Sequence, residues 1–254
     1  MPGLVTFVGA GPGDPELITV KGRLAIEAAD LVFYTGSLVP AAVVSWARKD
    51  ARLEDSSPLT LEEGHALTRD VALKGGHVAR VHTGDPSLYG ALREQAELLD
   101  RDGIPWRVIP GVTAACAAAA AAGIAFTVPQ VTQSLVITRA GGRTPMPETE
   151  KLRLLAAHKS SLAVYLGGRA AESVREELLA VLPSTTPVLC AHRVGQPEER
   201  LVWTDVDNMA RCVAERRLES QTIFLVLPGE EKKGARSCLY DPAFSHSFRP
   251  FTKT

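Results

Sequence analysis

The sequence has little that would direct it to nucleic acid or to a membrane. Its 28 Lys and Arg residues nearly balance 29 Asp and Glu residues, which leaves a net charge of −1 and no excess positive charge to attract nucleic acid. No basic stretch precedes an apolar one at the N-terminus, so we expect no signal peptide. The apolar segment Val112–Ala125 is too short to span a bilayer and is predicted to be an internal helix. These features favour a soluble, cytoplasmic protein.

Cysteine is also sparse. The four cysteines, Cys116, Cys190, Cys212 and Cys238, are far apart and form no CxxC pair, which argues against a zinc site or a thioredoxin-like motif. We therefore expect free thiols and no bound metal. With 45% hydrophobic residues in 254 positions, the chain can bury a sizeable core without disulfides or metals.

Strand-like and helical segments alternate along the chain, which predicts an α/β fold with mainly parallel sheets flanked by helices. The predicted strands of the first half are Leu4–Val8, Asp30–Tyr34, His77–Val81 and Trp106–Ile109, and its predicted helices are Thr19–Ala29, Leu61–Lys74 and Leu88–Asp100. The second half repeats the rhythm, with predicted strands at Ser134–Thr138, Ser161–Leu166, Pro187–His192 and Gln221–Leu227, and predicted helices at Glu148–Ala157, Ala170–Leu179 and Asp205–Glu215. We expect two α/β domains, 1–112 and 113–230, followed by a C-terminal arm, 231–254.

Three glycine-containing loops follow predicted strands, where open α/β sheets bind their ligands. The first, Val8–Pro15 (VGAGPGDP), has Pro15 just beyond its glycines, so it does not fit a dinucleotide turn that runs directly into a helix. The second, His82–Gly90 (HTGDPSLYG), contains Asp85 in a turn. The third, Ile109–Ala114 (IPGVTA), leads into the Ala-rich segment. Each loop alone is also compatible with a purely structural turn.

The order and spacing of these loops resemble the tetrapyrrole (corrin/porphyrin) methyltransferases, the class III S-adenosylmethionine-dependent enzymes. The resemblance extends through Tyr165–Gly168 and Pro187–Val194 to Gln221–Val226. It implies two α/β domains with the active site in a cleft between them, and a homodimer. Tyr34–Pro40 (YTGSLVP) and Gln130–Pro145 resemble the branch that methylates carbon C11 of precorrin-4 to give precorrin-5 in cobalamin biosynthesis. The C-terminal arm resembles that of the cobalt-free pathway enzymes.

The resemblance also implies which residues hold the cofactor. Those matching the family's cofactor contacts are Pro12, Thr83, Gly84, Asp85, Leu88, Thr113, Ala114, Leu166, Val194 and Thr222. The methyl group of S-adenosylmethionine is a strong electrophile, so positioning carries the catalysis and no acid or base is required for the transfer. His82 and Asp85 lie beside the expected cofactor, and either could remove a proton. S-Adenosylhomocysteine would be the product.

A polycarboxylate tetrapyrrole needs basic partners, for which Lys21, Arg139, Arg143 and Arg193 are candidates. Each could equally be a solvated surface charge. Several alternatives stay open: a cobalt-precorrin-4 methyltransferase of the anaerobic pathway, a sister precorrin or uroporphyrinogen C-methyltransferase, a protein methyltransferase like diphthine synthase, a nicotinamide-dependent oxidoreductase, or a tetrapyrrole carrier without catalysis.

Overall fold

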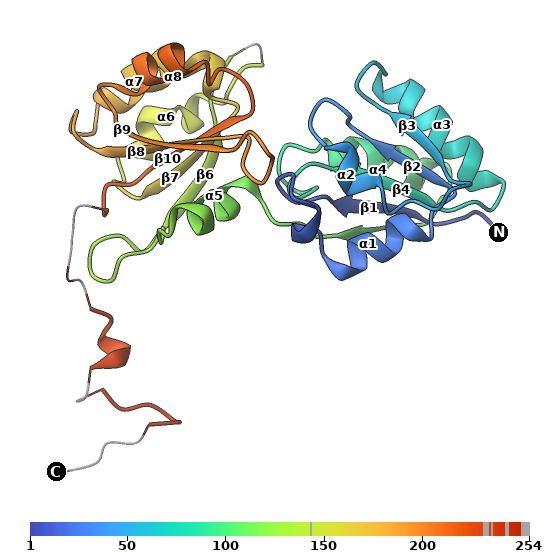
Figure 1. Cartoon of the computed structure of the whole chain (residues 1–254), viewed down its shortest axis with the longest axis horizontal. Helices are drawn as coiled ribbons and strands as arrows, with labels where there is room; N and C mark the ends of the chain where they lie inside the picture. Colours follow the sequence, from blue (N-terminus) through green and yellow to red (C-terminus); the bar gives the residue numbers. More distant parts are fainter. Residues whose placement is uncertain (143, 231–233, 235, 242–243, 250–254) are drawn as a thin grey trace. The chain divides into compact units, whose positions relative to one another are not determined.

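The computed structural model describes residues 1–142, 144–230, 234, 236–241 and 244–249 (Figure 1). The chain forms two compact units. The first comprises Met1–Ala118 and Arg193–Glu199, and the second comprises Ala119–His192 and Arg200–Thr254. The sequence suggested a single boundary at residue 112. It gave no indication that residues 193–199, here called the return segment, belong to the first unit. Among the described helices, none has the length and apolar character needed to cross a membrane.

The first unit is a parallel α/β layer structure. Its five strands follow the order β3-β2-β4-β1-β5, and every neighbouring pair is parallel. They are β1 (Val5–Gly9), β2 (Leu31–Tyr34), β3 (Arg52–Asp55), β4 (Val78–His82) and β5 (Trp106–Ile109). The helices are α1 (Val20–Glu27), α2 (Ala41–Val44), α3 (Leu61–Leu73) and α4 (Leu92–Arg101), with a 3-10 turn at Pro15–Leu17. This arrangement confirms the α/β prediction for the first half.

Both faces of the first sheet are buried, as expected for parallel strands. Successive side chains along a strand point to opposite faces. In β1, Phe7 joins a cluster with residues of α3 and α4, whereas Val8 joins a cluster with residues of α1 and α2. The helix α3 starts at a capping box, because the Thr60 hydroxyl accepts from the Glu63 amide (3.2 Å) and the Glu63 carboxylate accepts from the Thr60 amide (2.8 Å).

The second unit contains a mixed sheet in the order β6-β7-β10-β8-β9. Only β6 and β7 are parallel, and the remaining pairs are antiparallel. The prediction of a second mainly parallel sheet was therefore wrong, because residues 193–199 between β8 and β9 are too few for a crossover helix. The strands are β6 (Leu135–Arg139), β7 (Ser161–Tyr165), β8 (Pro187–His192), β9 (Arg200–Asp205) and β10 (Thr222–Val226).

The helices of this half are α5 (Ala114–Ala122), α6 (Leu152–Ala156), α7 (Ala171–Leu179) and α8 (Met209–Arg216), with 3-10 turns at Glu148–Glu150, Gly168–Ala170 and Cys238–Tyr240. The predicted helix Glu148–Ala157 is thus divided, and Asp205, predicted as helical, ends β9 instead. Residues of α6, α7 and α8 form one buried cluster with the strands, centred on Leu162, Leu178 and Phe224.

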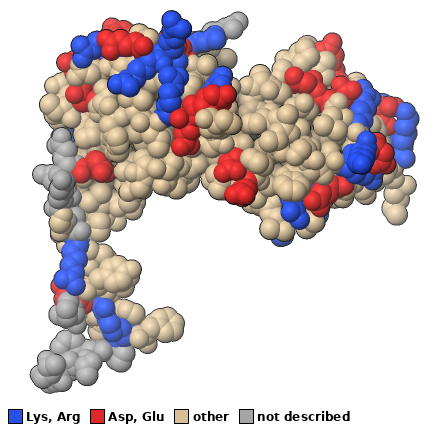
Figure 2. All heavy atoms as spheres, viewed as in Figure 1, with Lys and Arg blue, Asp and Glu red and all other residues tan. Residues whose placement is uncertain are grey.

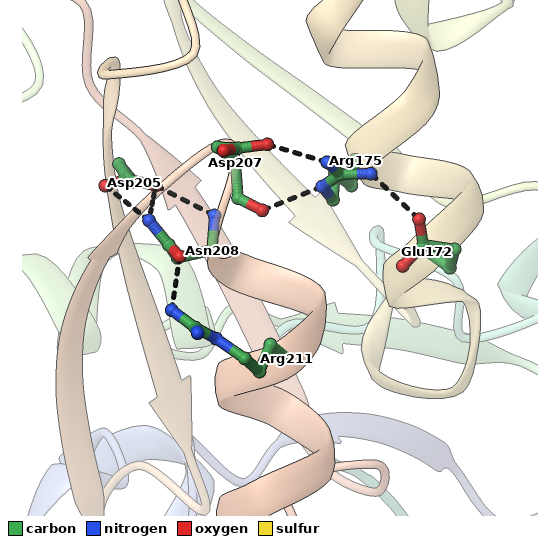
Figure 3. Close-up of polar contacts among 6 residues, drawn as sticks. All are labelled: Glu172, Arg175, Asp205, Asp207, Asn208 and Arg211. Carbon is green, nitrogen blue, oxygen red and sulfur yellow. Dashed lines mark hydrogen bonds and ion pairs between the residues drawn. The ribbon is translucent and has the colours of Figure 1, made fainter.

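A polar network fixes the start of α8 beside α7 (Figure 3). Arg175 of α7 donates from Nε to the Asp207 carbonyl (2.7 Å) and from Nη2 to the Asp207 carboxylate (2.6 Å). The hydrogen bond to Asp207 is the main cause that raises the pKa of Arg175. The Asp205 carboxylate accepts from the Asn208 amide at 2.8 Å. These contacts join secondary-structure elements, so we assign the network a structural role.

On the face drawn in Figure 2, acidic and basic side chains are mixed on each unit.

Candidate functional site

The three glycine loops meet at the carboxyl edge of the first sheet. They follow β1, β4 and β5, which are neighbours because the strand order is β4-β1-β5. Gly84 donates its amide to the Gly11 carbonyl at 2.7 Å, and Gly11 donates to the Gly84 carbonyl at 3.2 Å. Gly111 of the third loop donates its amide to Asp85 of the second at 2.9 Å. Motifs separated by up to a hundred residues therefore form one junction, at the edge where open α/β sheets bind ligands.

The junction requires glycine for two physical reasons. Gly11 (φ +76°) and Gly84 (φ +63°) adopt left-handed conformations that a side chain disfavours. At Gly111 the limit is space, because a Cβ atom there would lie 2.2 Å from the Gly84 carbonyl oxygen. A Cβ at Gly9 would likewise lie 2.4 Å from the Gly111 nitrogen. The loops thus present bare backbone to a ligand.

Asp85 holds two of these loops together. Burial raises the pKa of its carboxyl, but hydrogen bonds from the Ser87 hydroxyl and from the Gly111 and Ser87 amides outweigh this effect and lower the pKa. One carboxylate oxygen accepts from the Ser87 amide (2.9 Å) and hydroxyl, and the other accepts from Gly111. An ionised carboxylate with a lowered pKa is a weak proton acceptor. These contacts favour a positioning role over that of a base.

His82 ends β4 immediately before the second loop and is 6% exposed. Burial, and secondarily the charge of Arg80, lowers its pKa to about 3. The imidazole is therefore neutral at neutral pH and also a weak base. Its Nε2 is buried without a hydrogen-bond partner.

The return segment 193–199 packs against the first loop. Pro12 lies beside Gly195, where a Cβ atom would come within 3.0 Å of the Pro12 ring. Gly13 approaches Gln196 in the same way, with a hypothetical Cβ 2.5 Å from that side chain. Val194 is 6% exposed, and Arg193 forms an ion pair with Glu198 at 3.5 Å. The structure therefore brings the predicted residues Pro12 and Val194 into one unit, although they are distant in sequence.

The other predicted residues of the first unit lie on the same three loops or near them. Thr83 and Leu88 line a cavity of about 400 Å³, while Thr113 and Ala114 follow β5 at the start of α5. Lys21 is exposed on α1. Bare backbone at the junction of the three loops fits a cofactor with a flat adenine ring and a short polar chain, such as S-adenosylmethionine.

Leu166, Thr222 and Arg139 belong to the second unit. Leu166 follows β7 in a left-handed conformation (φ +55°) and is 67% exposed, and Thr222 starts the neighbouring strand β10. The Thr222 hydroxyl lies 3.0 Å from Nδ1 of His192. Arg139 donates to the carbonyls of Ala140, Thr144 and Pro145 and thereby shapes the loop after β6. Arg143 lies outside the described residues.

Sequence reasoning missed two parts of this region. The contact of Gly195 and Gln196 with the first loop left no signal, since nothing in residues 193–199 shows which loop they meet. Arg80, which lines the same cavity as Thr83, did have a signal. In the predicted strand His77–Val81, Arg80 stands two positions after Val78, on the same face of a buried strand.

Comparison with known proteins agrees with this geometry. The profile of the tetrapyrrole (corrin/porphyrin) methylases matches residues 4–210. A cobalt-precorrin-4 C(11)-methyltransferase of Methanocaldococcus jannaschii is 41% identical, with 96% of this chain and 95% of that protein covered. A precorrin-4 C(11)-methyltransferase of Pseudomonas aeruginosa is 40% identical, with 97% and 98% covered.

Solved structures extend the similarity to the fold. The cobalt precorrin-4 methyltransferase CbiF superposes with a TM-score of 0.86 at 39% identity, covering 88% of this chain and 94% of that one. A uroporphyrin-III C-methyltransferase from Thermus thermophilus, complexed with S-adenosylhomocysteine, gives a TM-score of 0.74 at 28% identity, covering 89% and 92%. With matching loops, fold and sequence over most of its length, this chain belongs to the tetrapyrrole (corrin/porphyrin) methylase family.

Proposed function

We propose that this chain transfers a methyl group from S-adenosylmethionine to C11 of precorrin-4, giving precorrin-5 in cobalamin biosynthesis. The observation that carries the proposal is the junction of the three loops, in which Gly11, Gly84 and Gly111 meet. Similarity of about 40% to C11-methyltransferases over nearly the whole chain supports the choice of ring carbon.

In this proposal the residues of the chain position the reactants and exclude water. S-Adenosylmethionine supplies an electrophilic methyl group. Pro12, Thr83, Gly84, Thr113 and Ala114 offer backbone and small side chains on the three loops, and Val194 closes the first loop from the return segment. Asp85 keeps the second and third loops at a fixed distance through its bond to Gly111. Such orientation contributes several kcal/mol, within a ceiling of about 7–11 kcal/mol.

Leu88 adds an apolar contact from the first unit, and Leu166 and Thr222 are proposed as contacts from the second. The exposed side chain of Leu166 is available to an adenine ring, whereas the buried Thr222 hydroxyl is engaged with His192. Lys21, Arg139, Arg143 and Arg193 remain proposed partners of the substrate carboxylates. The Arg139 guanidinium has only carbonyl acceptors among the described residues, so its charge can still attract an anion.

The cobalt content of the macrocycle is open to a direct test, because the cobalt-precorrin and precorrin relatives are almost equally similar. The purified protein would be incubated with methyl-¹³C S-adenosylmethionine and either precorrin-4 or cobalt-precorrin-4. Carbon NMR of the product locates the new methyl group. We expect it on C11 of the cobalt-free substrate, with higher kcat/KM than for the cobalt form. A methyl group on another carbon would refute the assignment.

Binding of the cofactor is tested separately by calorimetry with S-adenosylmethionine, S-adenosylhomocysteine and NADH. We expect binding of the first two and none of NADH. Failure of both methyl-donor forms to bind would contradict the interpretation of the loops. We also propose a homodimer in the cytoplasm, as the family resemblance implies, and light scattering would measure its mass.

A further inference from the structure

Two ionisable side chains lie in the central strand β4, on the face of the first sheet that packs against α3 and α4. In β4, the side chains of Val78, Arg80 and His82 point to one face of the sheet, and the residues between them point to the other face. Arg80 lies in register between Phe7 of β1 and Phe33 of β2. Val78 and both phenylalanines belong to the buried cluster under α3 and α4. A central parallel strand normally carries apolar residues on such a face, so Arg80 and His82 require an explanation.

Both side chains line the cavity of about 400 Å³ in the first unit. Strands β1, β2 and β4 and helices α3 and α4 contribute to its wall, which is mainly apolar and includes Phe7, Phe33 and Leu99. Its volume is at the lower end of the roughly 300–1,000 Å³ found for small-molecule pockets. It therefore suits a small ligand, or one arm of a larger ligand, rather than a whole macrocycle.

The Arg80 guanidinium has only neutral partners within the described part of the chain. It lies over the Phe33 ring, 4.4 Å from the centroid. Its Nε donates to Gln95 (2.9 Å), and its Nη1 donates to the Phe33 carbonyl (3.3 Å) and to the Ser56 hydroxyl (3.1 Å). Neither a carboxylate within 4.0 Å nor an acceptor for Nη2 occurs among these residues. Burial lowers the pKa of Arg80 to about 10, which still leaves it charged at neutral pH.

Arg80 is partly buried, and a cation withdrawn from water in this way is normally paired with an anion. His82 adds a second unsatisfied group to the same wall, because its Nε2 has no partner although the residue is 94% buried (6% exposed). The neutral imidazole contributes no second positive charge. His65 also lines the cavity, and its Nε2 lies 2.8 Å from the Asp102 carboxylate. The cavity therefore holds one uncompensated positive charge.

We propose that this cavity is a pocket for a carboxylate on a short aliphatic stem, with Arg80 as the residue that binds the carboxylate. A monoanion offsets the single guanidinium charge, whereas a phosphate would bring up to two negative charges. The apolar walls accommodate the stem. Because Thr83 and Leu88 of the second loop also line the cavity, the ligand is an acetate or propionate arm of the substrate, and this assignment rests on the proposed function. The other source of the same chemistry is a free small carboxylate.

The first experiment compares Arg80→Met with Arg107→Met. Arg107 lies on β5 of the same sheet, is exposed, and donates to the Thr6 hydroxyl at 3.2 Å; it does not line the cavity. We expect Arg80→Met to raise KM for the macrocycle about 10- to 100-fold, the effect of losing one charge-assisted hydrogen bond. The Kd for S-adenosylmethionine should not rise, because Arg80 is not among the proposed cofactor contacts. The melting temperature should not fall, because an apolar side chain replaces an unpaired charge. Arg107→Met should keep the wild-type KM.

The second experiment needs no methyl transfer and uses the wild-type protein. Propionate is titrated against the ¹⁵N-labelled protein, with propionamide as the neutral control, and the Arg80 Nε–H resonance is followed by NMR. We expect a saturable shift of this resonance with propionate and none with propionamide. Because Arg80→Met and Arg80→Lys lack the resonance, the backbone amide of Thr83, which lines the cavity, is followed in wild type and variants alike. It should shift in the wild type and not in Arg80→Met, and it should shift more weakly in Arg80→Lys, the variant to use if Arg80→Met does not fold. Competition between propionate and the macrocycle identifies the substrate arm as the ligand, whereas binding without competition identifies a free carboxylate.

Absence of any propionate response in the wild type, together with an unchanged KM in Arg80→Met, would overturn the pocket. An unfolded Arg80→Met combined with no propionate response would also overturn it, since Arg80 would then be structural. Propionate binding in a protein that does not methylate precorrin-4 would refute only the proposed function.

Discussion

Replacing Gly111 with alanine tests whether the junction of the three loops is as tightly packed as its geometry indicates. The new Cβ would lie 2.2 Å from the Gly84 carbonyl oxygen and 2.8 Å from the backbone of Gly9. Carbon and oxygen atoms without a covalent bond rarely approach closer than about 3.3 Å, so the Gly84 carbonyl must move by about 1 Å. Both obstacles are backbone atoms and cannot rotate away.

This movement disrupts the two hydrogen bonds between Gly11 and Gly84 and the bond from Gly111 to the Asp85 carboxylate. Neutral hydrogen bonds contribute about 1 kcal/mol each and one to a charged group about 2 kcal/mol. We therefore expect Gly111→Ala to lower the free energy of unfolding of the first unit by about 3–4 kcal/mol. S-Adenosylmethionine binding should weaken at least tenfold, since the same loops are proposed to hold it.

Two alanine substitutions separate the causes. Gly103 has a left-handed backbone (φ +65°) but nothing within 4 Å of a hypothetical Cβ, so Gly103→Ala should cost only about 1–2 kcal/mol. Gly142 has neither constraint, so Gly142→Ala should be neutral within about 0.5 kcal/mol. For Gly111→Ala and Gly103→Ala, urea unfolding would be followed by tryptophan fluorescence in a Trp203→Phe background, which leaves Trp46 and Trp106 of the first unit as probes. Gly142 lies in the second unit, so Gly142→Ala would be followed through Trp203 in a background with Trp46→Phe and Trp106→Phe. Gly111→Ala with wild-type stability and unchanged hydrogen exchange at Gly84 would refute the reasoning.

Three further predictions concern single side chains. Thr60→Ala removes the capping box of α3 and should cost about 1 kcal/mol in urea unfolding, whereas an unchanged midpoint would mean that the cap adds nothing. The lowered pKa of Asp85 means that its stabilising contribution is present above the unfolded value of about 3.9 and is lost as the pH falls toward the folded value. Wild type should therefore lose more stability than Asp85→Asn when acidified from pH ~5 to ~3, and parallel pH profiles would contradict this. Cys190 is buried, and burial raises the pKa of its thiol to about 12. Iodoacetamide should therefore modify the exposed Cys116 and Cys238 in the native protein and leave Cys190 unmodified. Mass spectrometry that finds all three equally labelled would contradict this.

Two strands have the predicted bounds: Trp106–Ile109 (β5), at an edge of the first sheet, and Pro187–His192 (β8), a buried run inside the second. The strands that were missed, β3 (RLED) and β9 (RLVWTD), are at sheet edges, where half of each strand meets solvent and charged residues are tolerated. The helix predicted from Leu88 begins at Leu92 because Tyr89 (φ +56°) and Ala91 (φ +48°) are left-handed, and periodicity carries no signal for this.

The sequence by itself determined the α/β class, the positions of the three glycine loops, and the family, because glycine and proline spacing records local backbone geometry. It could not determine which strands are neighbours. Only the order β4-β1-β5 brings Gly11, Gly84 and Gly111 together, and only the return of residues 193–199 places Gly195 against Pro12. The same holds for Arg80. The sequence shows that it shares a strand face with Val78, but only the tertiary structure shows that its neighbours are the uncharged residues Phe33, Ser56 and Gln95. Contacts between distant segments are set by long-range packing, and a single sequence records only the local preferences that allow them.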